Sequence, residues 1–235
     1  MEQGEGLTLK VVARIHTDFP TKFGIPRQSG LVEALKSTLV FEPAYRNPDA
    51  LRGLEDFSHL WLIWEFSQAV RDGWSPMVRP PRLGGNAKMG VFATRSPFRP
   101  NPLGLSCVAL EGIEQHPTLG PVLHLRGADL MDGTPIYDIK PYLPHVDCRL
   151  DARGGFAQQT KDYALQVEIP EELLEQIPLE LQEPLYQVLA QDPRPSYQKD
   201  PQRVYGFPFA HLEVKFTVCD GVLHVCQIQE RAPSP

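Results

Sequence analysis

The sequence predicts a mainly β protein, in which a single-sheet β-barrel at the N-terminus is followed by a small C-terminal α+β domain. The 235 residues include 24 prolines and 18 glycines, and prolines disfavour long helices because they remove a backbone donor. Short β-rich segments recur with Gly/Pro loops between them, which is typical of barrels and closed sheets. Since no glycine-rich phosphate loop and no G-x-G-x-x-G fingerprint follows a strand, we do not expect a Rossmann cofactor site.

The strands of the expected barrel differ in character. Phe57–Phe66, FSHLWLIWEF, is nearly continuous in apolar and aromatic residues and predicts a central buried strand. The other segments are β-rich and end at turn residues: Leu7–Ile15, Ser37–Pro43, Lys88–Arg95, Cys107–Ile113, Pro121–Leu125 and Ile136–Ile139.

The character of the sequence changes near Asp147. The polar segment 147–162 contains two adjacent glycines and predicts a linker, so we expect a barrel domain at 1–146 and a C-terminal domain at 147–235. Tyr163–Ile169 is a strand candidate. Ile169–Asp192 has a helical composition, and its internal prolines, Pro178 and Pro184, predict two or three short helices.

A β-hairpin is expected near the C-terminus. Asp220-Gly221 is a typical two-residue turn, and His211–Gln229 flanks it with alternating apolar residues. In this register Cys219 faces Val222 and Cys226 faces Lys215. One face of the hairpin would carry Val214, Phe216, Val218, Leu223 and Val225.

The overall composition is that of a cytoplasmic protein. Hydrophobic residues make up 42% and the formal net charge is −6; no apolar run is long enough for a membrane span, and the first residues, MEQGEGLTLK, lack a signal-peptide core. The cysteines form no C-x-x-C pair and we expect reduced thiols. Nor do the histidines make H-x-H or H-E-x-x-H, and we expect no metal site. The cysteines are Cys107, Cys148, Cys219 and Cys226.

Positive charge is concentrated in the segment Val78–Leu105, which contains four arginines and one lysine but no Asp or Glu. Prolines and glycines surround these cations, and guanidinium groups on a stiff loop suit phosphate or carboxylate recognition. The segment therefore predicts an anion site, with nucleic acid as the leading ligand. The RNA-binding candidates are Arg79, Arg82, Lys88 and Arg99.

Two further segments leave alternatives open. DPRPSY, at 192–197, is a stiff loop whose Arg194 and Tyr197 suit contacts with an RNA backbone or a base, although these six residues alone slightly favour a loop that ends a helix. The acidic turn DLMDGTP, at 129–135, is either a solvated turn or, with the tyrosines and lysine that follow it, a functional site. The adjacent pair Ser58 and His59 is not expected to form a catalytic couple, because neighbouring strand residues point to opposite faces.

Several segments together resemble one family, the YaeB/TsaA-type tRNA N6-adenosine methyltransferases of the full-length, two-domain kind. The resemblance extends over nearly the whole chain, and its basic segment and its DGTP-x-x-DIKPYLP segment are highly specific. The segments that carry it are Ile25–Gln28, Leu54–Trp61, Arg79–Leu105, Asp129–Pro144 and Leu189–Tyr197.

The resemblance implies a single-sheet β-barrel that binds S-adenosyl-L-methionine and works as a homodimer. It implies methyl transfer to N6 of threonylcarbamoyladenosine at position 37, next to the anticodon of threonine tRNAs. Ser67 stands where relatives have a histidine, so its contact is expected through the backbone. Carried over by motif, the cofactor-binding residues are Pro26, Arg27, Gln28, Ser67, Gln68, Arg95, Leu105, Asp129, Leu130, Met131 and Asp132.

The chemistry of this transfer suggests the catalytic candidates. A methyl sulfonium is already electrophilic, so the enzyme mainly positions it. The ureido nitrogen is a poor nucleophile, and a protein group is expected to accept its proton or stabilise an anion. Asp138, Lys140 and Tyr142 follow the acidic turn closely and are predicted to do this.

Two other functions fit the same residues in part. A non-catalytic RNA-binding barrel would keep the arginines but does not explain the acidic turn. A barrel enzyme acting on a small acidic substrate agrees better with the net charge of −6. Measuring cofactor binding distinguishes the RNA-binding barrel from the methyltransferase. Comparing tRNA with small molecules as methyl acceptors distinguishes the enzyme with a small acidic substrate from the methyltransferase.

Overall fold

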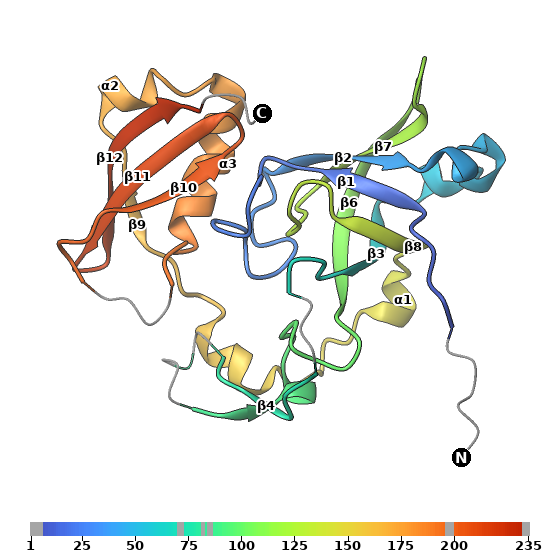
Figure 1. The fold of residues 1–235 in the computed structure, drawn as a ribbon, viewed down its shortest axis with the longest axis horizontal. Helices are drawn as coiled ribbons and strands as arrows, with labels where there is room; N and C mark the ends of the chain where they lie inside the picture. Colours follow the sequence, from blue (N-terminus) through green and yellow to red (C-terminus); the bar gives the residue numbers. More distant parts are fainter. Residues whose placement is uncertain (1–6, 70–72, 81–82, 84–86, 196–199, 232–235) are drawn as a thin grey trace.

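The computed structural model describes residues 7–69, 73–80, 83, 87–195 and 200–231. Its strands form a closed barrel, a separate four-stranded sheet and a two-stranded ribbon (Figure 1). The helices are few and short beside the sheets (Figure 1). The predicted mainly β class is therefore confirmed.

The barrel contains six strands in the order β1-β2-β7-β6-β3-β8. It closes because β1 pairs antiparallel with both β2 and β8. Alternate residues of each strand point inward, as they must in a barrel that is packed with side chains. The strands are β1 Ala13–His16, β2 Lys36–Phe41, β3 His59–Glu65, β6 Leu103–His116, β7 Gly120–Arg126 and β8 Pro135–Pro141.

β3 lies within the predicted central strand, but it is buried on one side only. Leu60, Leu62 and Trp64 are buried inside the barrel. The alternate residues face outward, where Trp61 is half-buried beside the Tyr142 ring at 5.7 Å. Two of the outward-facing residues are also apolar, and this aromatic contact covers part of the outer face.

The expected strand Lys88–Arg95 is wrong for most of its length. Only Met89–Gly90 is a strand, β5, and it pairs with β4, Met77–Val78. A 3-10 helix, Val91–Ala93, follows, and the side chain of Thr94 donates to the Val91 carbonyl at 2.8 Å. The backbone of this segment is thus satisfied locally rather than by a neighbouring strand.

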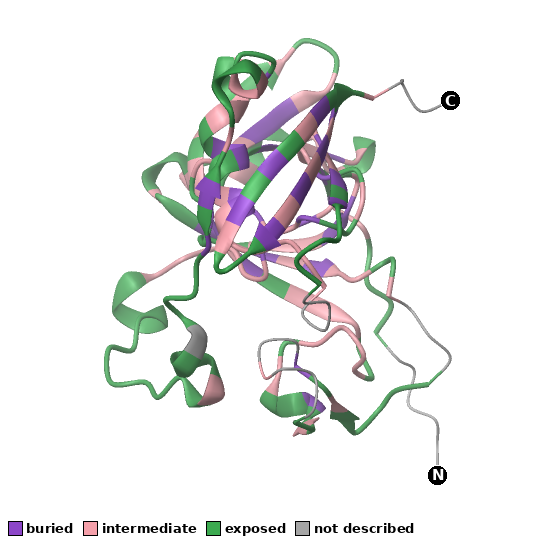
Figure 2. Cartoon of the chain, turned by 90° about the vertical axis from the view of Figure 1, so that its left-hand side faces the viewer, coloured by how far each residue is buried: buried purple, intermediate pink, exposed green. Residues whose placement is uncertain are grey.

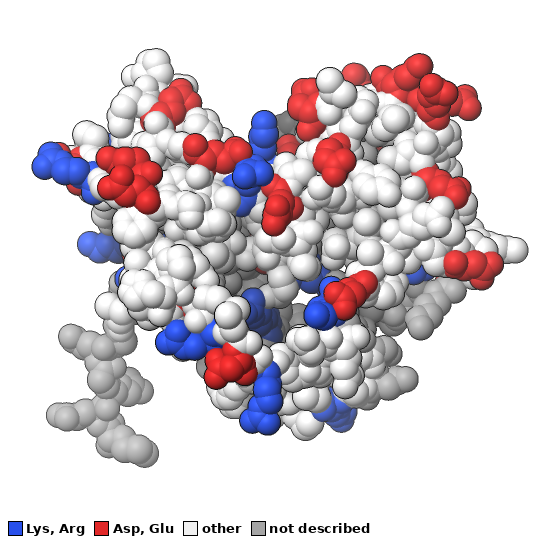
Figure 3. Space-filling model, turned by 180° about the vertical axis from the view of Figure 1, so that it is seen from behind, with Lys and Arg blue, Asp and Glu red and all other residues white. Residues whose placement is uncertain are grey.

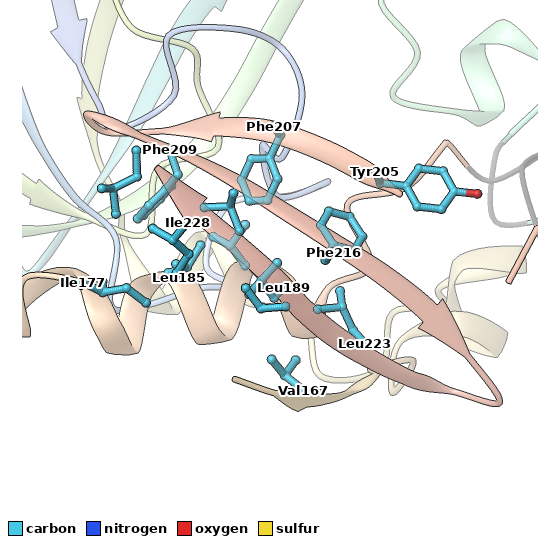
Figure 4. Close-up of a cluster of buried hydrophobic side chains, with 14 of the residues drawn as sticks. Val167, Ile177, Leu185, Leu189, Tyr205, Phe207, Phe209, Phe216, Leu223 and Ile228 are labelled. Atoms are coloured by element: carbon cyan, nitrogen blue, oxygen red, sulfur yellow. The ribbon is translucent and has the colours of Figure 1, made fainter. Parts of the chain in front are cut away.

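The C-terminal sheet has the order β10-β11-β12-β9, with β9 parallel to β12. Buried and exposed residues alternate along its strands (Figure 2), and the helices cover its buried face (Figure 4). Its elements are β9 Gln166–Glu168, α2 Glu171–Leu174, α3 Leu179–Ala190, β10 Tyr205–Phe209, β11 Leu212–Cys219 and β12 Val222–Glu230. Helices elsewhere are α1 Pro144–Asp147 and 3-10 helices at Pro43–Tyr45, Pro48–Leu51, Leu54–Asp56 and Gly155–Thr160.

The predicted hairpin is confirmed at its turn and corrected at its far end. Cys219 pairs with Val222, and Asp220 and Gly221 have φ of 49° and 82°, as a two-residue turn requires. The expected pairing of Cys226 with Lys215 is wrong, because the register shifts between Lys215 and the next residue. The bulge leaves the predicted apolar face intact: Val214, Phe216, Val218, Leu223 and Val225 are all buried.

The expected helix break at Pro184 is wrong, whereas the one at Pro178 is confirmed. α2 ends at Leu174, and α3 begins directly after Pro178 and continues through Pro184. Proline in a helix interior removes one backbone hydrogen bond. Here Leu185 and Leu189, next to the lost bond, are fully buried, and burial of two leucine side chains contributes about 3–6 kcal/mol.

Two separate hydrophobic cores hold the structure together. The first fills the barrel and the second lies between the C-terminal sheet and α3 (Figure 4). The second core also contains Phe19, Val32 and Leu35, which come from the loop between β1 and β2. The C-terminal unit is therefore completed by residues of the N-terminal part.

Candidate functional site

A largely buried carboxylate, that of Asp129, lies at the centre of the candidate site. Its Oδ1 accepts a hydrogen bond from Ser106 Oγ on β6 at 2.5 Å. Ser106 Oγ in turn accepts one from Trp64 Nε1 on β3 at 2.9 Å. The backbone N–H of Ser29 donates to the same carboxylate. Three separate segments therefore fix the position of this side chain.

The electrostatic environment of Asp129 is unusual. Burial raises the pKa of the Asp129 carboxyl, and the Ser106 hydrogen bond and the nearby Arg95 only partly offset this. A ligand that donates hydrogen bonds or carries positive charge would stabilise the ionised form. A carboxyl with a raised pKa beside an arginine is the kind of group that marks a functional site.

Arg95 and the loop at 26–29 complete this group. The Arg95 guanidinium donates to the side-chain carbonyl of Gln28, and the Gln28 amide donates to the Arg27 carbonyl. The side chain of Ser29 accepts from the Cys107 N–H at 3.1 Å, which ties the loop to β6. Gln28, Arg95 and Asp129, predicted as cofactor-binding residues, thus come together from distant parts of the sequence.

Pro26, Ser67, Gln68 and Leu105, also predicted to bind the cofactor, take no part in the hydrogen bonds of this group. Pro26 is buried. Ser67 and Gln68 are exposed just after β3, where the Ser67 N–H donates to the Glu65 carbonyl at 2.8 Å. Leu105 is 53% exposed on the outer side of β6.

The rest of the acidic turn serves the fold. Leu130 is buried in the barrel core, and the Met131 carbonyl accepts from the Thr134 hydroxyl at 2.6 Å. The Asp132 carboxylate accepts from the Thr17 N–H at 3.1 Å and contacts His16 Nδ1 at 3.2 Å. Asp132 therefore anchors the end of β1, and its carboxylate is not part of the Asp129 group.

The catalytic candidates lie on the outer face of the barrel wall. Ile63 on β3 pairs with Leu105 on one side and with Asp138 on the other, so these residues form one row across the sheet. Lys140 Nζ lies 2.9 Å from Asp138 Oδ2. These side chains share a face with Leu105, whereas Ser106 and Asp129 lie on the inner side.

Tyr142 lies beside two other aromatic rings. Its ring lies 5.7 Å from that of Trp61 and 6.2 Å from that of His59. Asp147 in α1 accepts from Trp61 Nε1 at 3.0 Å, which covers this aromatic group. Desolvation and the neighbouring Cys148 raise the pKa of the Tyr142 hydroxyl. This hydroxyl can donate a hydrogen bond at neutral pH but is a poor base.

The predicted RNA-binding residues fall into different groups. Arg79 and Lys88 are exposed, while Arg82 and Tyr197 lie outside the described residues. Arg99 donates to the carbonyls of its own segment, at 2.8 Å to Thr94 and 3.2 Å to Val91. Its guanidinium therefore supports the loop.

Arg194 is bound inside the C-terminal unit. Its Nε and Nη2 donate to the Asp192 carboxylate at 2.7 and 2.9 Å, and both side chains are only 13–14% exposed. Tyr163 donates to the same carboxylate at 2.7 Å, and the guanidinium lies 6.0 Å from the Tyr205 ring. The charge of Arg194 is thus neutralised within the protein by the Asp192 carboxylate.

The surface agrees with an anionic ligand. In Figure 3, several lysines and arginines lie around the hollow at the centre and below it, with acidic side chains among them, while most acidic side chains lie in the upper half of the view. A hollow of about 270 Å³ is lined by Phe92, Arg99, Pro100, Asn101 and Leu103. Local positive charge is therefore present despite the net charge of −6.

Sequence reasoning missed several residues of the site. Ser106 and Trp64 orient Asp129, but a serine in an apolar strand carries no local signal of such a role. An exposed aromatic pair at the basic segment was missed as well: Trp74 and Phe92 are 50% and 76% exposed, with ring centroids 6.1 Å apart. Phe92 lies within the expected strand Lys88–Arg95, so it was not considered as an exposed ring, although an aromatic residue within a basic segment was the available signal.

The geometric reason given against a Ser58 and His59 couple is corrected, although no catalytic role follows from it. Ser58 Oγ lies 2.9 Å from His59 Nδ1. β3 begins only at His59, so the alternation of strand residues does not separate the two side chains. This contact lies on the exposed side of the barrel, away from Asp129.

Other classes of site find no support in the part of the chain that the structure describes. Among those residues, no helix is long and apolar enough to span a bilayer. Within the same ranges, no three His, Cys, Asp or Glu side chains are grouped to hold a metal ion. The four cysteines are free thiols.

Comparison with known proteins gives consistent matches along the chain. Residues 14–148 match the family described as "tRNA-methyltransferase O N-terminal domain", and residues 158–231 match "TrmO C-terminal domain". The "tRNA (adenine(37)-N6)-methyltransferase" of Escherichia coli K12 is 43% identical over 225 residues, covering 92% of this chain and 95% of the relative.

Two further similarities come from Pseudomonas aeruginosa. A "Putative S-adenosylmethionine-dependent methyltransferase RcsF" is 44% identical over 211 residues, covering 86% of this chain and 89% of the relative. A crystal structure of TrmO superposes with a TM-score of 0.79 at 35% identity, covering 98% of this chain and 100% of that chain.

The ion pair of Arg194 gives a prediction about stability. Burial raises the pKa of Asp192, but the hydrogen bonds from Arg194 and Tyr163 outweigh it, so the pKa is lowered below 3.8. Such a group adds stability above its unfolded pKa and loses it as the pH falls through the folded value. Arg194→Ala should therefore lower the free energy of unfolding by about 2 kcal/mol at pH 7, and by less at pH 3.

Urea unfolding at the two pH values measures this difference. Arg203→Ala is the matched control, because Arg203 lies over the same Tyr205 ring at 5.5 Å, and it should cost only about 0.5 kcal/mol. Equal losses in the two variants, or a loss that does not change with pH, would contradict the assigned ion pair.

Proposed function

The chain belongs to the tRNA-methyltransferase O family of S-adenosylmethionine-dependent tRNA methyltransferases, and from this we propose its reaction in detail. It transfers a methyl group from S-adenosyl-L-methionine to N6 of threonylcarbamoyladenosine at position 37 of tRNA. The product is N6-methyl-N6-threonylcarbamoyladenosine. The observation that carries this proposal is the meeting of Gln28, Arg95 and Asp129 around one buried carboxylate.

Further parts of the proposal follow the family. The chain acts on threonine tRNAs as a homodimer in the cytoplasm. Its barrel domain, 1–146, binds the cofactor, and its C-terminal domain, 147–235, follows the linker at 147–162. The two family models, which match residues 14–148 and 158–231, support this division.

The residues around Asp129 suit the functional groups of the cofactor. Its amino-acid part carries an ammonium and a carboxylate, and its ribose carries hydroxyls. A buried carboxylate can accept from hydroxyl or ammonium donors, and a guanidinium such as that of Arg95 can bind a carboxylate through two parallel hydrogen bonds. When bound, S-adenosyl-L-methionine supplies a methyl group already activated by a sulfonium.

The protein then has to position the nucleophile and remove its proton. As the N6–C bond forms and the S–C bond breaks, the N6 proton must leave. Asp138 is the acceptor we propose, held by Lys140 at 2.9 Å. Tyr142, whose hydroxyl has a raised pKa, donates a hydrogen bond to the carbamoyl oxygen. Since these residues lie on the outer face of the wall, their role requires the base to reach that face.

Cofactor binding is the first test. Asp129→Asn keeps the shape of the side chain but removes its charge, and we expect S-adenosyl-L-methionine to bind about tenfold more weakly, a loss of 1.4 kcal/mol. Isothermal titration calorimetry with the parent and the variant measures this. Asp49→Asn is the matched control, because that exposed carboxylate pairs with Arg52, outside the predicted cofactor residues, and should leave cofactor affinity unchanged. A parent that binds no cofactor would favour a non-catalytic RNA-binding barrel.

RNA contact is tested by its dependence on salt. Each phosphate that a cation neutralises on a single strand contributes about −0.7 to the slope of log K against log salt. Arg79→Ala and Lys88→Ala should each weaken tRNA binding and flatten this slope by about that amount. Arg52→Ala is the control, because Arg52 is an exposed arginine that lies outside the basic segment and pairs with Asp49.

The same titration separates charge from stacking. Phe92→Ala should weaken binding by about 1–3 kcal/mol if a base stacks on the exposed ring, with the salt slope unchanged. Variants at Arg79 and Lys88 that keep the slope of the parent would show that these cations contact no phosphate.

Turnover tests the catalytic candidates. If Asp138 takes the proton, Asp138→Asn should slow single-turnover methyl transfer by about a hundredfold or more, with the affinities for cofactor and tRNA retained. Lys140→Ala and Tyr142→Phe should slow it less, because they act on Asp138 and on the substrate oxygen. Lys36→Ala, an exposed lysine on β2, is the control. Rates like the parent's in all three variants would mean that the enzyme works by positioning alone.

A further inference from the structure

The loop between β1 and β2 contacts both units of the molecule. We call residues 19–35 the cofactor loop, because its middle holds Pro26, Arg27 and Gln28. Gln28, Ser29 and Gly30 make hydrogen bonds toward the barrel, and Phe19, Val32 and Leu35 are buried in the core of the C-terminal unit. The contacts on each side show which unit holds the loop in its conformation.

Three apolar side chains of the loop are buried by the C-terminal unit. Phe19 packs edge-to-face on Phe209 with ring centroids 5.6 Å apart. Val32 and Leu35 are 1% and 3% exposed and belong to the core between the C-terminal sheet and α3. Beside them, the Ala210 N–H donates to the Asp18 carbonyl at 2.7 Å.

A close contact lies just before the cofactor-binding residues. Gly24 has φ of +82°, and a Cβ built on it would lie 2.3 Å from Cδ2 of Phe207. The Phe207 ring on β10 therefore rests directly against the backbone of the loop, two residues before Pro26. Ile25, between them, packs against the same core.

The barrel holds the loop only through polar contacts. The Gly30 N–H donates to the Gly127 carbonyl at 2.9 Å, and Ser29 and Gln28 make the bonds to Cys107 and Arg95 described above. All of residues 19–35 are described in the structure, and the barrel core contains none of them. Most of the apolar burial of the loop is thus supplied by the C-terminal unit.

We propose that Phe207 and Phe209 are positioning residues for the cofactor. They hold the cofactor loop in its binding shape, so the affinity for S-adenosyl-L-methionine depends on a sheet that does not touch the reacting atoms. This inference rests on the proposed function of the loop. By linkage, cofactor binding must stabilise the contact between the loop and the C-terminal unit to the same extent.

The test compares substitutions within one core. Phe207→Ala removes the ring against Gly24, and Leu223→Ala removes a fully buried side chain at the far end of the sheet, beside Val167 (Figure 4). Phe207→Ala should weaken S-adenosyl-L-methionine binding by about tenfold, within the usual range for coupled sites. Leu223→Ala should leave the affinity for S-adenosyl-L-methionine within about twofold of the parent's, when both variants are measured below their melting temperatures. Phe207→Leu should restore part of the affinity that Phe207→Ala loses.

Two readouts separate positioning from general loss of structure. In steady-state kinetics, the KM for S-adenosyl-L-methionine should rise in Phe207→Ala while kcat at saturating cofactor stays near that of the parent. Hydrogen exchange without any ligand should show faster exchange in residues 19–35 of Phe207→Ala but not of Leu223→Ala.

Each outcome decides between alternatives. Equal weakening by Phe207→Ala and Leu223→Ala, or no weakening by Phe207→Ala, would overturn the inference. A parent that binds no cofactor would instead refute the proposed function, and the hydrogen exchange of the loop would still show whether Phe207 sets its conformation. Gly24→Ala should reproduce the effect of Phe207→Ala, because its Cβ and the ring cannot occupy the same space.

Discussion

The close approach of β3 and β6 is the constraint on which the site depends. A Cβ at Gly104 would lie 2.3 Å from the Trp64 ring, so only glycine fits there, and the indole can lie flat against β6. Trp64 Nε1 then reaches Ser106, and Ser106 reaches Asp129. A buried carboxylate is costly unless it is hydrogen-bonded. The packing of one aromatic ring inside the barrel thus makes a largely buried acidic group possible at the candidate site.

Arginines in this chain have two different uses, which composition does not distinguish. Arg99 and Arg194 donate to carbonyls and to a carboxylate within the protein, while Arg79 and Arg95 are exposed. A guanidinium has several donors in a fixed plane, so it can satisfy loop carbonyls as well as phosphates. A basic segment in a protein of net charge −6 therefore predicts where an anion binds, but it does not predict which of its arginines contact the anion.

Sequence reasoning succeeded where structure is local and failed where partners are distant. Asp220-Gly221 fixed its own turn, because positive φ values are a property of those residues. Pro184 did not break its helix, because the burial around it outweighed a local preference. Gln28 was predicted only through resemblance, while Arg95 and Asp129 also stood out in the basic segment and the acidic turn. Ser106 was not predicted, because the contacts that orient it come from β3 and the acidic turn.

The domain boundary expected near Asp147 does not separate the two hydrophobic cores, because residues from before the boundary belong to the C-terminal core. Phe19, Val32 and Leu35 precede it by more than one hundred residues, yet they complete the C-terminal core. A change in composition along the sequence indicates a linker, but it does not indicate that a loop from the N-terminal part packs into the C-terminal core. Because that loop carries Arg27 and Gln28 between its apolar anchors, loosening the part of the C-terminal core that contacts the loop must also loosen the residues proposed to bind the cofactor. Ligand binding at one unit is therefore expected to depend on the packing of Phe207 and Phe209 in the other, and not on the stability of that core as a whole.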